Sequence, residues 1–365
     1  MKRKLSYHTS VNYSLADPVK VLAQKLGKAT AKNMPFGFKE IEGTRGESAY
    51  VFDMGTIMGA LVQEGLGTKS LVAQQVYKLT GKSYFAAIAK DTVATVINDL
   101  ISVGATPVVM NAYWSSSSYD WLTDNKLATD FVKGWKMACD EARVTWGGGE
   151  TQSLPGVIEV GALEFAGSGF GVIKPKSNHV NGSKLRVGDA ILLLESSGVH
   201  ANGISLAREI AAKLKQGYQT KLSDGSTYGE ALLIPTLLYT QVLQNFFAAK
   251  LDIHYLSNIT GHGWRKLMRS SQEFTYIIES VPKPQPVFDF IQQQSGNSLK
   301  DMYGNYNMGA GYGVYLPEKD ALKAQAIAKK LKINSWIAGH IEAGPRQVVI
   351  RPNKIIFKSD TLEVR

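Results

Sequence analysis

The chain has little cysteine and no long apolar run, and both features exclude classes of protein. Cys139 is the single cysteine among 365 residues, so the chain has no internal disulfide and no cysteine-based zinc site. This usage is typical of a reducing cytosol, and the neighbours of Cys139 predict a buried helical thiol. No stretch reaches the length of a membrane span. The basic start, Met1 to His8, precedes no apolar segment, so we expect a cytoplasmic protein without a secretory leader.

The sequence also lacks the features of a nucleic-acid-binding protein, although its formal net charge is +10. Lys and Arg are spread along the chain, with no Arg-rich arm and no basic run interleaved with aromatic residues. Attraction for a small polyanion such as a nucleotide explains the charge more simply. We therefore expect neither a nucleic-acid partner nor a membrane partner. A hydrophobic content of 44% and the chain length indicate an ordinary globular protein with room for two domains.

The order of periodic segments predicts a mixed α/β (α+β) protein in two halves. Asp17 and Pro18 are typical of a helix cap and first helical position, which predicts a helix over 17–29. Further helices are expected at 89–104, 127–142 and 204–214. Strands are expected at 50–54, 57–62, 107–113 and 190–194, with paired strands over 157–172. Because the polar stretch 174–184 interrupts the pattern, we predict domains over 1–175 and 176–365.

The predicted helix over 89–104 has an unusual polar face. Its core stripe is apolar, whereas Asp91, Asn98 and Asp99 lie on or beside another face. Lys and Arg are absent from residues 91–102, which is uncommon on a solvated face. The helix alone leaves two interpretations equally open, a solvated surface and a magnesium site built from hard oxygen ligands. Asp91 could also cap the first turn, and Gly104 could close the last one.

Two glycine-rich segments in the amino-terminal half are candidates for ligand contacts. Glu64-Gly-Leu-Gly-Thr-Lys69 is not a Walker A motif, because Thr68 separates Gly67 from Lys69. It is either a turn with a surface lysine or a nest of backbone N–H groups that meets phosphate. Gly147 to Thr151 follows a short predicted strand. Its glycines allow close backbone approach to a ligand, although a plain turn is the commoner explanation.

A third glycine-rich segment lies between a predicted strand and a predicted helix, over residues 197–203. This is a frequent place for an anion site. A lone histidine is more often structural than catalytic, but His200 lies on a glycine-flanked turn where packing gives it little reason to be.

These segments occur in an order that is more specific than any one of them. Residues 64–69, 91–107, 148–156 and 188–203 are followed by Pro235-Thr, Ile259-Thr-Gly and Asn307-Met-Gly. Over residues 60–341 the chain resembles the aminoimidazole ribonucleotide synthetase (phosphoribosylformylglycinamidine cyclo-ligase) family. The wider superfamily includes formylglycinamidine synthetase, thiamine-phosphate kinase, selenophosphate synthetase and a hydrogenase maturation protein.

The resemblance implies a fold, an activity and a set of partners. The implied fold has an N-terminal domain that pairs strands in a barrel shared by a homodimer, and a C-terminal mixed sheet with helices. The implied enzyme uses ATP and Mg2+ to close formylglycinamidine ribonucleotide into aminoimidazole ribonucleotide in purine biosynthesis. ATP activates the formyl amide oxygen as a phosphate ester, and attack by the ring nitrogen then expels phosphate.

The resemblance also implies roles for individual residues. The magnesium ligands and their neighbours would be Glu64, Asp91, Asn98, Asp99 and Glu150. The residues that hold ATP would be Gly65, Gly67, Thr68, Lys69, Gly148, Gly149 and Thr151. The residues near the substrate, or donors to developing charge, would be His200, Asn202, Thr260 and Asn307.

Three departures from the family pattern leave alternatives open. Glu64 replaces an aspartate, Leu237 replaces an arginine after Pro-Thr, and Asn258 replaces a histidine that could shuttle protons. His262 compensates for Asn258 only if its ring reaches the same place. The alternatives are another ATP-using enzyme of the superfamily with a different small substrate, and a non-catalytic relative that binds nucleotide.

Overall fold

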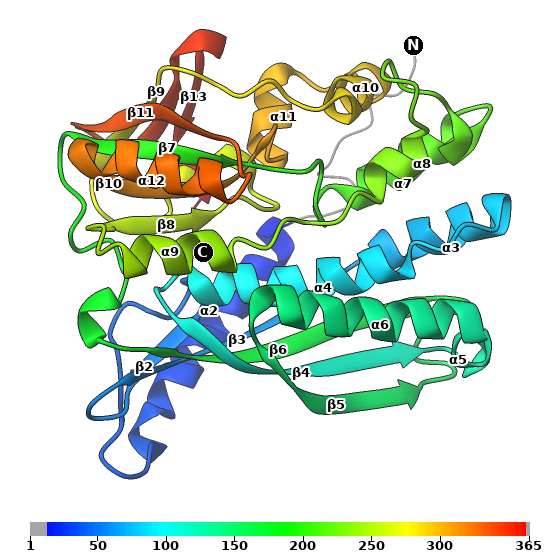
Figure 1. The fold of residues 1–365 in the computed structure, drawn as a ribbon, viewed down its shortest axis with the longest axis horizontal. Coiled ribbons are helices and arrows are strands. Elements are labelled where there is room, and N and C mark those ends of the chain that lie inside the picture. Colours follow the sequence, from blue (N-terminus) through cyan, green and yellow to red (C-terminus); the bar gives the residue numbers. More distant parts are fainter. Residues whose placement is uncertain (1–12, 363–365) are drawn as a thin grey trace.

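The computed structural model describes residues 13–362 and contains two β-sheets with their helices (Figure 1). The predicted mixed α/β fold in two halves is confirmed. The basic start, on which the expectation of no leader rests, lies outside the described residues. No helix within residues 13–362 is long and apolar enough to cross a membrane.

The amino-terminal sheet has six strands in the order β1-β2-β3-β6-β4-β5. All neighbours are antiparallel except β4 and β5, which are parallel. Helices α4 and α6 pack on the same sheet and on each other (Figure 1). The bounds are β1 Lys39–Glu40, β2 Tyr50–Asp53, β3 Met58–Gly65, β4 Thr106–Ser116, β5 Thr145–Ser153, β6 Leu163–Ile173, α2 Tyr13–Ala29, α3 Lys69–Thr80, α4 Phe85–Ile101, α5 Asp120–Thr123 and α6 Asn125–Ala142.

The carboxy-terminal sheet has seven strands in the order β13-β12-β9-β11-β7-β10-β8. Only β12 and β9 pair in parallel among its described strands. Its strands are β7 Asp189–Glu195, β8 Tyr255–Asn258, β9 Phe274–Ile278, β10 Ala310–Pro317, β11 Ser335–Ala343, β12 Gln347–Ile350 and β13 Ile355–Lys358. Its helices are α7 Ile204–Lys213, α8 Tyr228–Leu232, α9 Thr240–Ala248, α10 Pro286–Ser295, α11 Leu299–Asn305 and α12 Glu318–Lys330.

Six short 3-10 turns complete the description. They are η1 Ala31–Asn33, η2 Lys176–Asn178, η3 Gly217–Gln219, η4 Gly263–Met268, η5 Arg351–Asn353 and η6 Ser359–Leu362. The polar stretch 174–184 runs between the end of β6 and the start of β7, and therefore connects the two sheets.

The structure corrects two expected helix starts. Helix α2 begins at Tyr13, so Asp17 and Pro18 lie inside it rather than at its start. Pro18 is the sixth residue of α2 and lies beyond its first turn, so it removes one intrahelical hydrogen bond. Helix α4 begins at Phe85, so Asp91 lies in its interior and does not cap it.

The structure also corrects the strands around the glycine-rich segment. Residues 145–153 form strand β5, and Gly147 to Gly149 lie within it rather than in a turn after it. The span 157–172 contains one strand, β6, and not a pair. Gly149 is required where β5 pairs with β4, because a Cβ there would lie 2.1 Å from the carbonyl oxygen of Ala112. The low strand propensity of glycine had favoured a turn.

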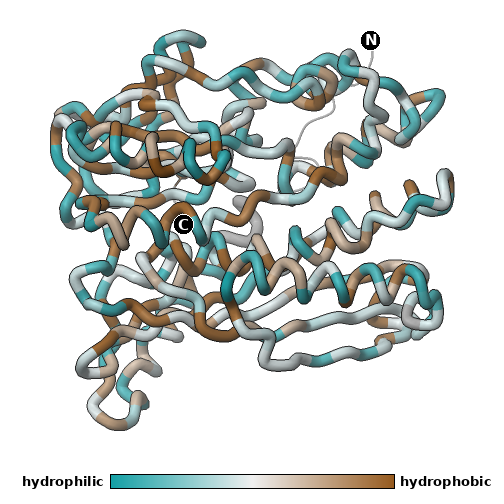
Figure 2. The backbone as a smooth tube through the Cα atoms, in the orientation of Figure 1, coloured by the Kyte–Doolittle hydropathy of each residue, from teal (hydrophilic) through white to brown (hydrophobic). Residues whose placement is uncertain are grey.

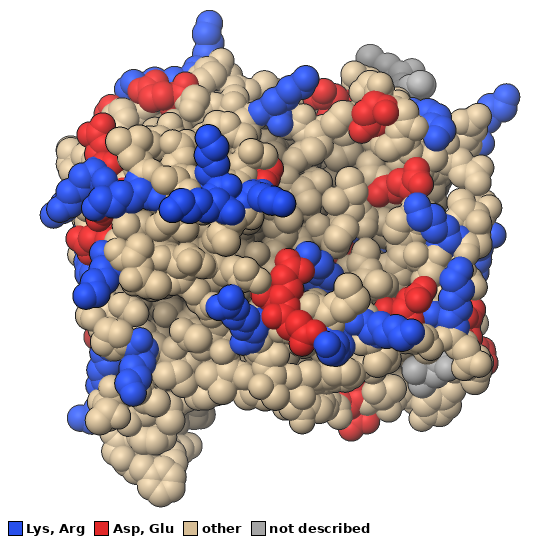
Figure 3. All heavy atoms as spheres, in the orientation of Figure 1, with Lys and Arg blue, Asp and Glu red and all other residues tan. Residues whose placement is uncertain are grey.

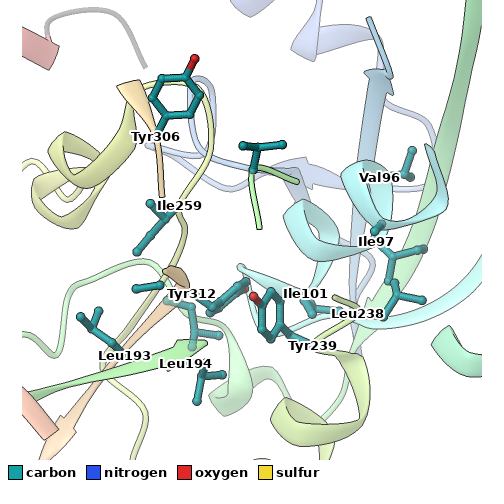
Figure 4. Packing of buried hydrophobic residues seen from close by; sticks show 14 of the residues in the cluster. Val96, Ile97, Ile101, Leu193, Leu194, Leu238, Tyr239, Ile259, Tyr306 and Tyr312 are labelled. Carbon is teal, nitrogen blue, oxygen red and sulfur yellow. The ribbon is translucent and has the colours of Figure 1, made fainter. Parts of the chain in front are cut away.

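Helix α4 lies between the two halves of the molecule and belongs to their common core. Its expected apolar stripe is buried, with Val93, Ile97 and Leu100 at 0% exposure. Figure 4 shows Ile97 and Ile101 beside Leu238 and Tyr239 of the carboxy-terminal half. Hydrophobic segments also gather along this central layer in Figure 2. Burial of this face is the main force that fixes the helix between the domains.

Candidate active site

The polar face of α4 is buried against the carboxy-terminal half, so its interpretation as a solvated surface is wrong. Asp91 is 0% exposed, Asn98 1% and Asp99 8%. The segments that meet this face are residues 234–239, strand β8 with the loop after it, and strand β10. The face therefore lies at the junction of the two domains, where ligand sites are common.

Lys69 and Asp91 form a fully buried ion pair at one end of this face. The Lys69 Nζ lies 2.7 Å from the Asp91 Oδ2 and also donates to the carbonyl oxygens of His200 and Ile234 at 2.8 and 3.0 Å. Asp91 Oδ1 accepts from the backbone N–H and hydroxyl of Thr236 at 2.8 and 2.5 Å. Burial lowers the pKa of Lys69 and raises that of Asp91, and their mutual attraction opposes both shifts.

This ion pair fixes the relative positions of α3, α4 and two loops of the other domain. An ammonium group has three N–H donors, and Lys69 uses all three on protein oxygens. No N–H of Lys69 is left for a phosphate in this structure. The interpretation of Lys69 as a surface residue is wrong, because its side chain is 0% exposed.

The next residues along the face bond to the carboxy-terminal half in the same way. Asn98 donates from Nδ2 to the carbonyl oxygen of Leu237 at 2.8 Å and accepts the N–H of Tyr239 at 3.1 Å. Asp99 Oδ1 accepts from Asn258 Nδ2 at 2.7 Å. Leu237 and Asn258, which both differ from the family pattern, therefore both contact α4. Leu237 does so through its backbone.

Glu64, at the end of β3, lies in the electrostatic field of Asp99. Burial, the larger cause, and the nearby charge of Asp99 raise the pKa of Glu64 to about 7, against the opposing effects of Lys266 and Arg269. Two carboxylates from different elements therefore approach each other at the domain junction. Mg2+ is commonly held by one or two carboxylates while it keeps several waters, so this pair fits the donor set that the ion needs.

The five residues predicted to surround magnesium do not converge in one chain. Asp91 and Asn98 are committed to the interdomain contacts above, and Glu150 is exposed on β5. Glu64, Gly167, Ala112 and Gly149 lie in one row across four strands. Three strand spacings separate the two ends of that row by on the order of 14 Å. Among residues 13–362, no group of three His, Cys, Asp or Glu side chains is placed to hold a metal ion.

Gly65, Gly67 and Thr68 lead from β3 into α3. Gly67 has φ +74°, a conformation that favours glycine, and Thr68 is the residue before the first turn of α3. Gly65 and Gly67 are exposed, so their backbones are accessible. The segment retains the form of a phosphate-binding turn, whereas Gly148, Gly149 and Thr151 lie exposed on β5, at the opposite end of the row.

The residues predicted near the substrate divide into structural and accessible groups. His200 is 3% exposed, its Nε2 accepts the N–H of Ser197 at 3.2 Å, and burial with the charge of Lys69 lowers its pKa to about 3. Asn307 is 2% exposed and bonds to Ser196 Oγ and the Gly198 carbonyl, each at 2.8 Å. Asn307 therefore holds the loop around His200 in place.

Thr260 and Asn202 are less deeply buried. Thr260 accepts a hydrogen bond from Lys266 Nζ on the loop that follows β8, and this loop also supplies Asn258 to Asp99. Asn202 lies on the turn before α7, where its backbone N–H donates to the Val199 carbonyl at 3.3 Å.

Sequence reasoning missed the cations beside Glu64. Burial, the larger cause, and the charge of Arg269 together lower the pKa of Lys266 to about 8. Arg269 is 7% exposed, donates to the Ser48 hydroxyl at 2.8 Å and lies 3.5 Å from Glu47. His262 lies among these cations, and burial with the charge of Lys266 lowers its pKa to about 3. No motif marks Lys266 or Arg269, and only the fold brings them to β3 and α4.

Comparisons with known proteins match both halves of the chain. Residues 46–173 match the model of the AIR synthase related protein, N-terminal domain, and residues 186–351 match that of the C-terminal domain. The chain is 33% identical over 299 residues to a phosphoribosylformylglycinamidine cyclo-ligase of Methanococcus vannielii, a match that covers 82% of each chain. It is 33% identical over 301 residues to the protein of that name from Methanocaldococcus jannaschii, covering 82% of this chain and 81% of the relative.

Solved structures with similar folds share less sequence. A chain of a HypE–HypF complex aligns with a TM-score of 0.62 and 18% identity, over 92% of this chain and 98% of that one. T. maritima PurL complexed with FGAR aligns with a TM-score of 0.61 and 15% identity, over 88% and 48%. HypE in complex with ATP aligns with a TM-score of 0.56 and 19% identity, over 80% and 81%.

Proposed function

Because this chain belongs to the AIR synthase related protein family, we propose that it is an ATP-dependent phosphoribosylformylglycinamidine cyclo-ligase. The observation that carries the proposal is the 33% identity to curated cyclo-ligases over 82% of both chains. The substrate is formylglycinamidine ribonucleotide and the product is aminoimidazole ribonucleotide, an intermediate of purine biosynthesis.

The proposed reaction has two steps on one substrate. The formyl amide oxygen attacks the γ-phosphorus of ATP, which releases ADP and leaves a phosphate ester. The ring-closing nitrogen then attacks the same carbon, the carbon–oxygen bond breaks, phosphate departs and a proton is lost. Both steps need a polyphosphate held in line with the amide, donors for developing charge and exclusion of water.

The domain junction supports this chemistry with groups of both signs. Glu64 and Asp99 are the carboxylates we assign to the magnesium ion that accompanies ATP, and when bound that ion neutralises phosphate charge. The exposed backbone of Gly65 and Gly67 is assigned to the phosphates. Lys266 and Thr260 lie beside the carboxylates and supply a positive charge and a hydroxyl.

We assign Lys69, Asp91, Asn98 and Asn307 to positioning rather than to contact with ATP. Their side-chain polar atoms are bonded to protein groups that join the two domains or hold the loop at His200. His200 is neutral near pH 7, because its pKa is about 3, and it can act there only as a neutral hydrogen-bonding group.

The exposed groups of β5 are assigned to an interface with a second copy of the chain. Within residues 13–362, β5 has a neighbouring strand on one side only, and Gly148, Gly149, Glu150 and Thr151 are exposed along it. An unpaired edge of this length is a ready template for pairing with another chain. We propose a homodimer in which these residues complete the site of the partner.

A second candidate is an ATP-using enzyme of the same fold with another small substrate. The observation that favours it is Asn258, which is bonded to Asp99 and cannot shuttle protons near neutral pH as a histidine would. A non-catalytic nucleotide-binding relative remains the third.

Release of ADP by the purified protein tests these candidates. With ATP and magnesium present, formylglycinamidine ribonucleotide is expected to raise ADP release at least tenfold over the rate without it. No increase would refute the cyclo-ligase proposal. An increase with a different amide or phosphorylated compound would favour the second candidate, and ATP binding without turnover on any compound would favour the third.

A further inference from the structure

We propose that a groove between α3 and α7, outside the candidate active site, binds a nucleoside phosphate. The groove has a volume of about 940 Å³ and lies between one helix of each domain. Figure 1 shows α3 and α7 on the same side of the molecule, with the turn η3 following α7 in the chain. Sites for small organic ligands usually measure about 300–1,000 Å³ and often lie at domain junctions.

The floor of the groove is apolar and comes from both helices. Leu71, Gln75 and Leu79 lie at i, i+4 and i+8 on α3, so they share one face of that helix. Ala211 and Ala212 of α7 line the opposite side, and their small side chains leave space between the helices. Leu79 is 52% exposed, an unusual state for a leucine that faces another element.

The rim of the groove is cationic. Arg208, Lys215 and Lys221 line it, and within residues 13–362 none of the three pairs with a carboxylate. Lys221 Nζ donates to the Gly225 carbonyl at 3.0 Å, and Arg208 bonds to the side chain of Tyr218. Figure 3 shows Lys and Arg spread over one face of the molecule, with Asp and Glu interspersed among them. Three cations without acidic partners around one concavity are complementary to a phosphate group.

An aromatic ring and amide side chains complete the lining. Tyr218 of η3 contributes its ring and packs against Tyr228 with centroids 6.5 Å apart. Gly229 permits this arrangement, because a Cβ there would lie 2.7 Å from Val76 and 3.0 Å from the Tyr218 Cβ. A base can stack on such a ring, and Gln75 and Gln219 can bond to its polar edge.

A second cavity of about 300 Å³ continues the groove past Leu79, Tyr218 and Lys221. Glu230 contributes a carboxylate to this second cavity. It should repel a bound anion only weakly, because its negative charge already interacts with neighbouring groups. Glu230 accepts from Thr227 at 2.9 Å and lies 3.4 Å from Lys82. The hydrogen bonds from Thr227 lower the pKa of Glu230 to about 2.

The combination of a ring, amides and cations without acidic partners favours a nucleotide over a purely apolar ligand. The ligand would contact both domains. Lys69, at the start of α3, bonds to Asp91 and to the carbonyl of His200. Helix α3 therefore contacts both the groove and the candidate active site, so that binding at one can influence the other.

Binding of AMP tests the proposal, and variants of the groove lining distinguish this site from the candidate active site. We expect calorimetry to detect AMP binding to the wild-type chain, at least tenfold weaker binding by Lys215→Glu/Lys221→Glu, and a similar loss in Leu79→Trp, which fills the groove. Ribose 5-phosphate, which lacks the base, should bind at least tenfold more weakly than AMP.

The control is Lys213→Glu/Lys250→Glu, which changes the net charge equally at exposed positions outside the groove lining. It should bind AMP like the wild type. Absence of AMP binding by the wild type, equal affinity in the groove variants, or equal affinity for ribose 5-phosphate would overturn the proposal. Turnover of formylglycinamidine ribonucleotide is measured separately, so loss of the groove and failure of the proposed activity are distinguishable.

Discussion

Lys69 and Asp91 join segments that are far apart in the chain. Removal of either partner should lower the free energy of unfolding by a large amount. Breaking a buried ion pair by removing one partner typically costs about 3–5 kcal/mol, because the remaining charge stays buried without compensation. The Lys69 side chain and the Asp91 side chain are both 0% exposed. The pair therefore orders the domain junction more than an exposed pair of the same length could.

Replacement of either partner tests this role. Asp91→Asn is expected to lower the free energy of unfolding by about 3–5 kcal/mol, since Lys69 then lacks its counter-ion. Urea unfolding followed by tryptophan fluorescence would measure the loss. Lys136→Met is the matched control, because Lys136 pairs with Asp140 at 2.6 Å but is 70% exposed, and its loss should cost less than about 1 kcal/mol. Equal losses in the two variants would contradict the role.

His254 makes stability depend on pH. It is 3% exposed and bonds through Nδ1 to Asp189 at 2.6 Å and through Nε2 to Asp252 at 3.0 Å. Burial lowers the pKa of His254, but its bonds to the two carboxylates outweigh that effect and the pKa is raised. Its protonated form therefore stabilises the fold below the unfolded pKa of about 6.5, and that contribution is lost as pH rises through the folded pKa.

The variant His254→Gln checks the sign. The difference in unfolding free energy between the wild type and this variant should be largest near pH 6 and should shrink as the pH is raised toward 9. Chemical unfolding at a series of pH values would provide the curve. A difference that stays constant, or one that grows with pH, would show that His254 is not held protonated by its two partners.

At the scale of elements, α4 acts as the joint between the two sheets. Its apolar stripe packs in the common core, and its polar face bonds to the other domain through Asp91, Asn98 and Asp99. Periodicity in the sequence predicted the stripe, the helix and the unusual face. It could not decide what the face meets, because the partners Thr236, Tyr239 and Asn258 are brought there only by the tertiary fold.

Asn98 provides a direct test of this joint. Asn98→Leu should leave the N–H of Tyr239 and the carbonyl of Leu237 without their partner, at a cost of about 1–3 kcal/mol for each buried group. Thermal unfolding would measure the effect. Asn245→Ala removes an exposed bond to Gln241 and should change stability by less than about 0.5 kcal/mol. A neutral Asn98→Leu variant would show that α4 docks through its apolar face alone.

The other elements show which structural features the local sequence pattern predicts and which it does not. Cys139 was predicted as a buried helical thiol, and it is 4% exposed on α6, where burial raises its pKa to about 12. For the glycines of β5 a plain turn was the commoner explanation, because the preference of glycine for turns gives no sign of a pairing that depends on β4. Lys266 carries no local signal, and its proximity to Glu64 depends on the packing of one domain against the other.

For the whole molecule, we propose that an amide oxygen of the substrate is phosphorylated at the domain junction and that ring closure follows there. The order of segments along the sequence indicated the family, and the comparisons confirm that membership. Which side chains contact ATP depends on geometry across two domains and, in the proposed homodimer, on β5 of a second chain. The residue assignments at Glu64, Asp99 and Lys266 therefore remain predictions to be tested with variants of the active protein.

Transfer of an oxygen isotope from substrate to phosphate tests whether the amide oxygen is phosphorylated. Formylglycinamidine ribonucleotide labelled with 18O at the formyl amide is incubated with ATP, magnesium and the protein, and the released phosphate is analysed by mass spectrometry. Because the amide oxygen bonds to phosphorus before its bond to carbon breaks, the account predicts one 18O in each phosphate and one aminoimidazole ribonucleotide for each ADP. Unlabelled phosphate, or ADP release without this product, would contradict it.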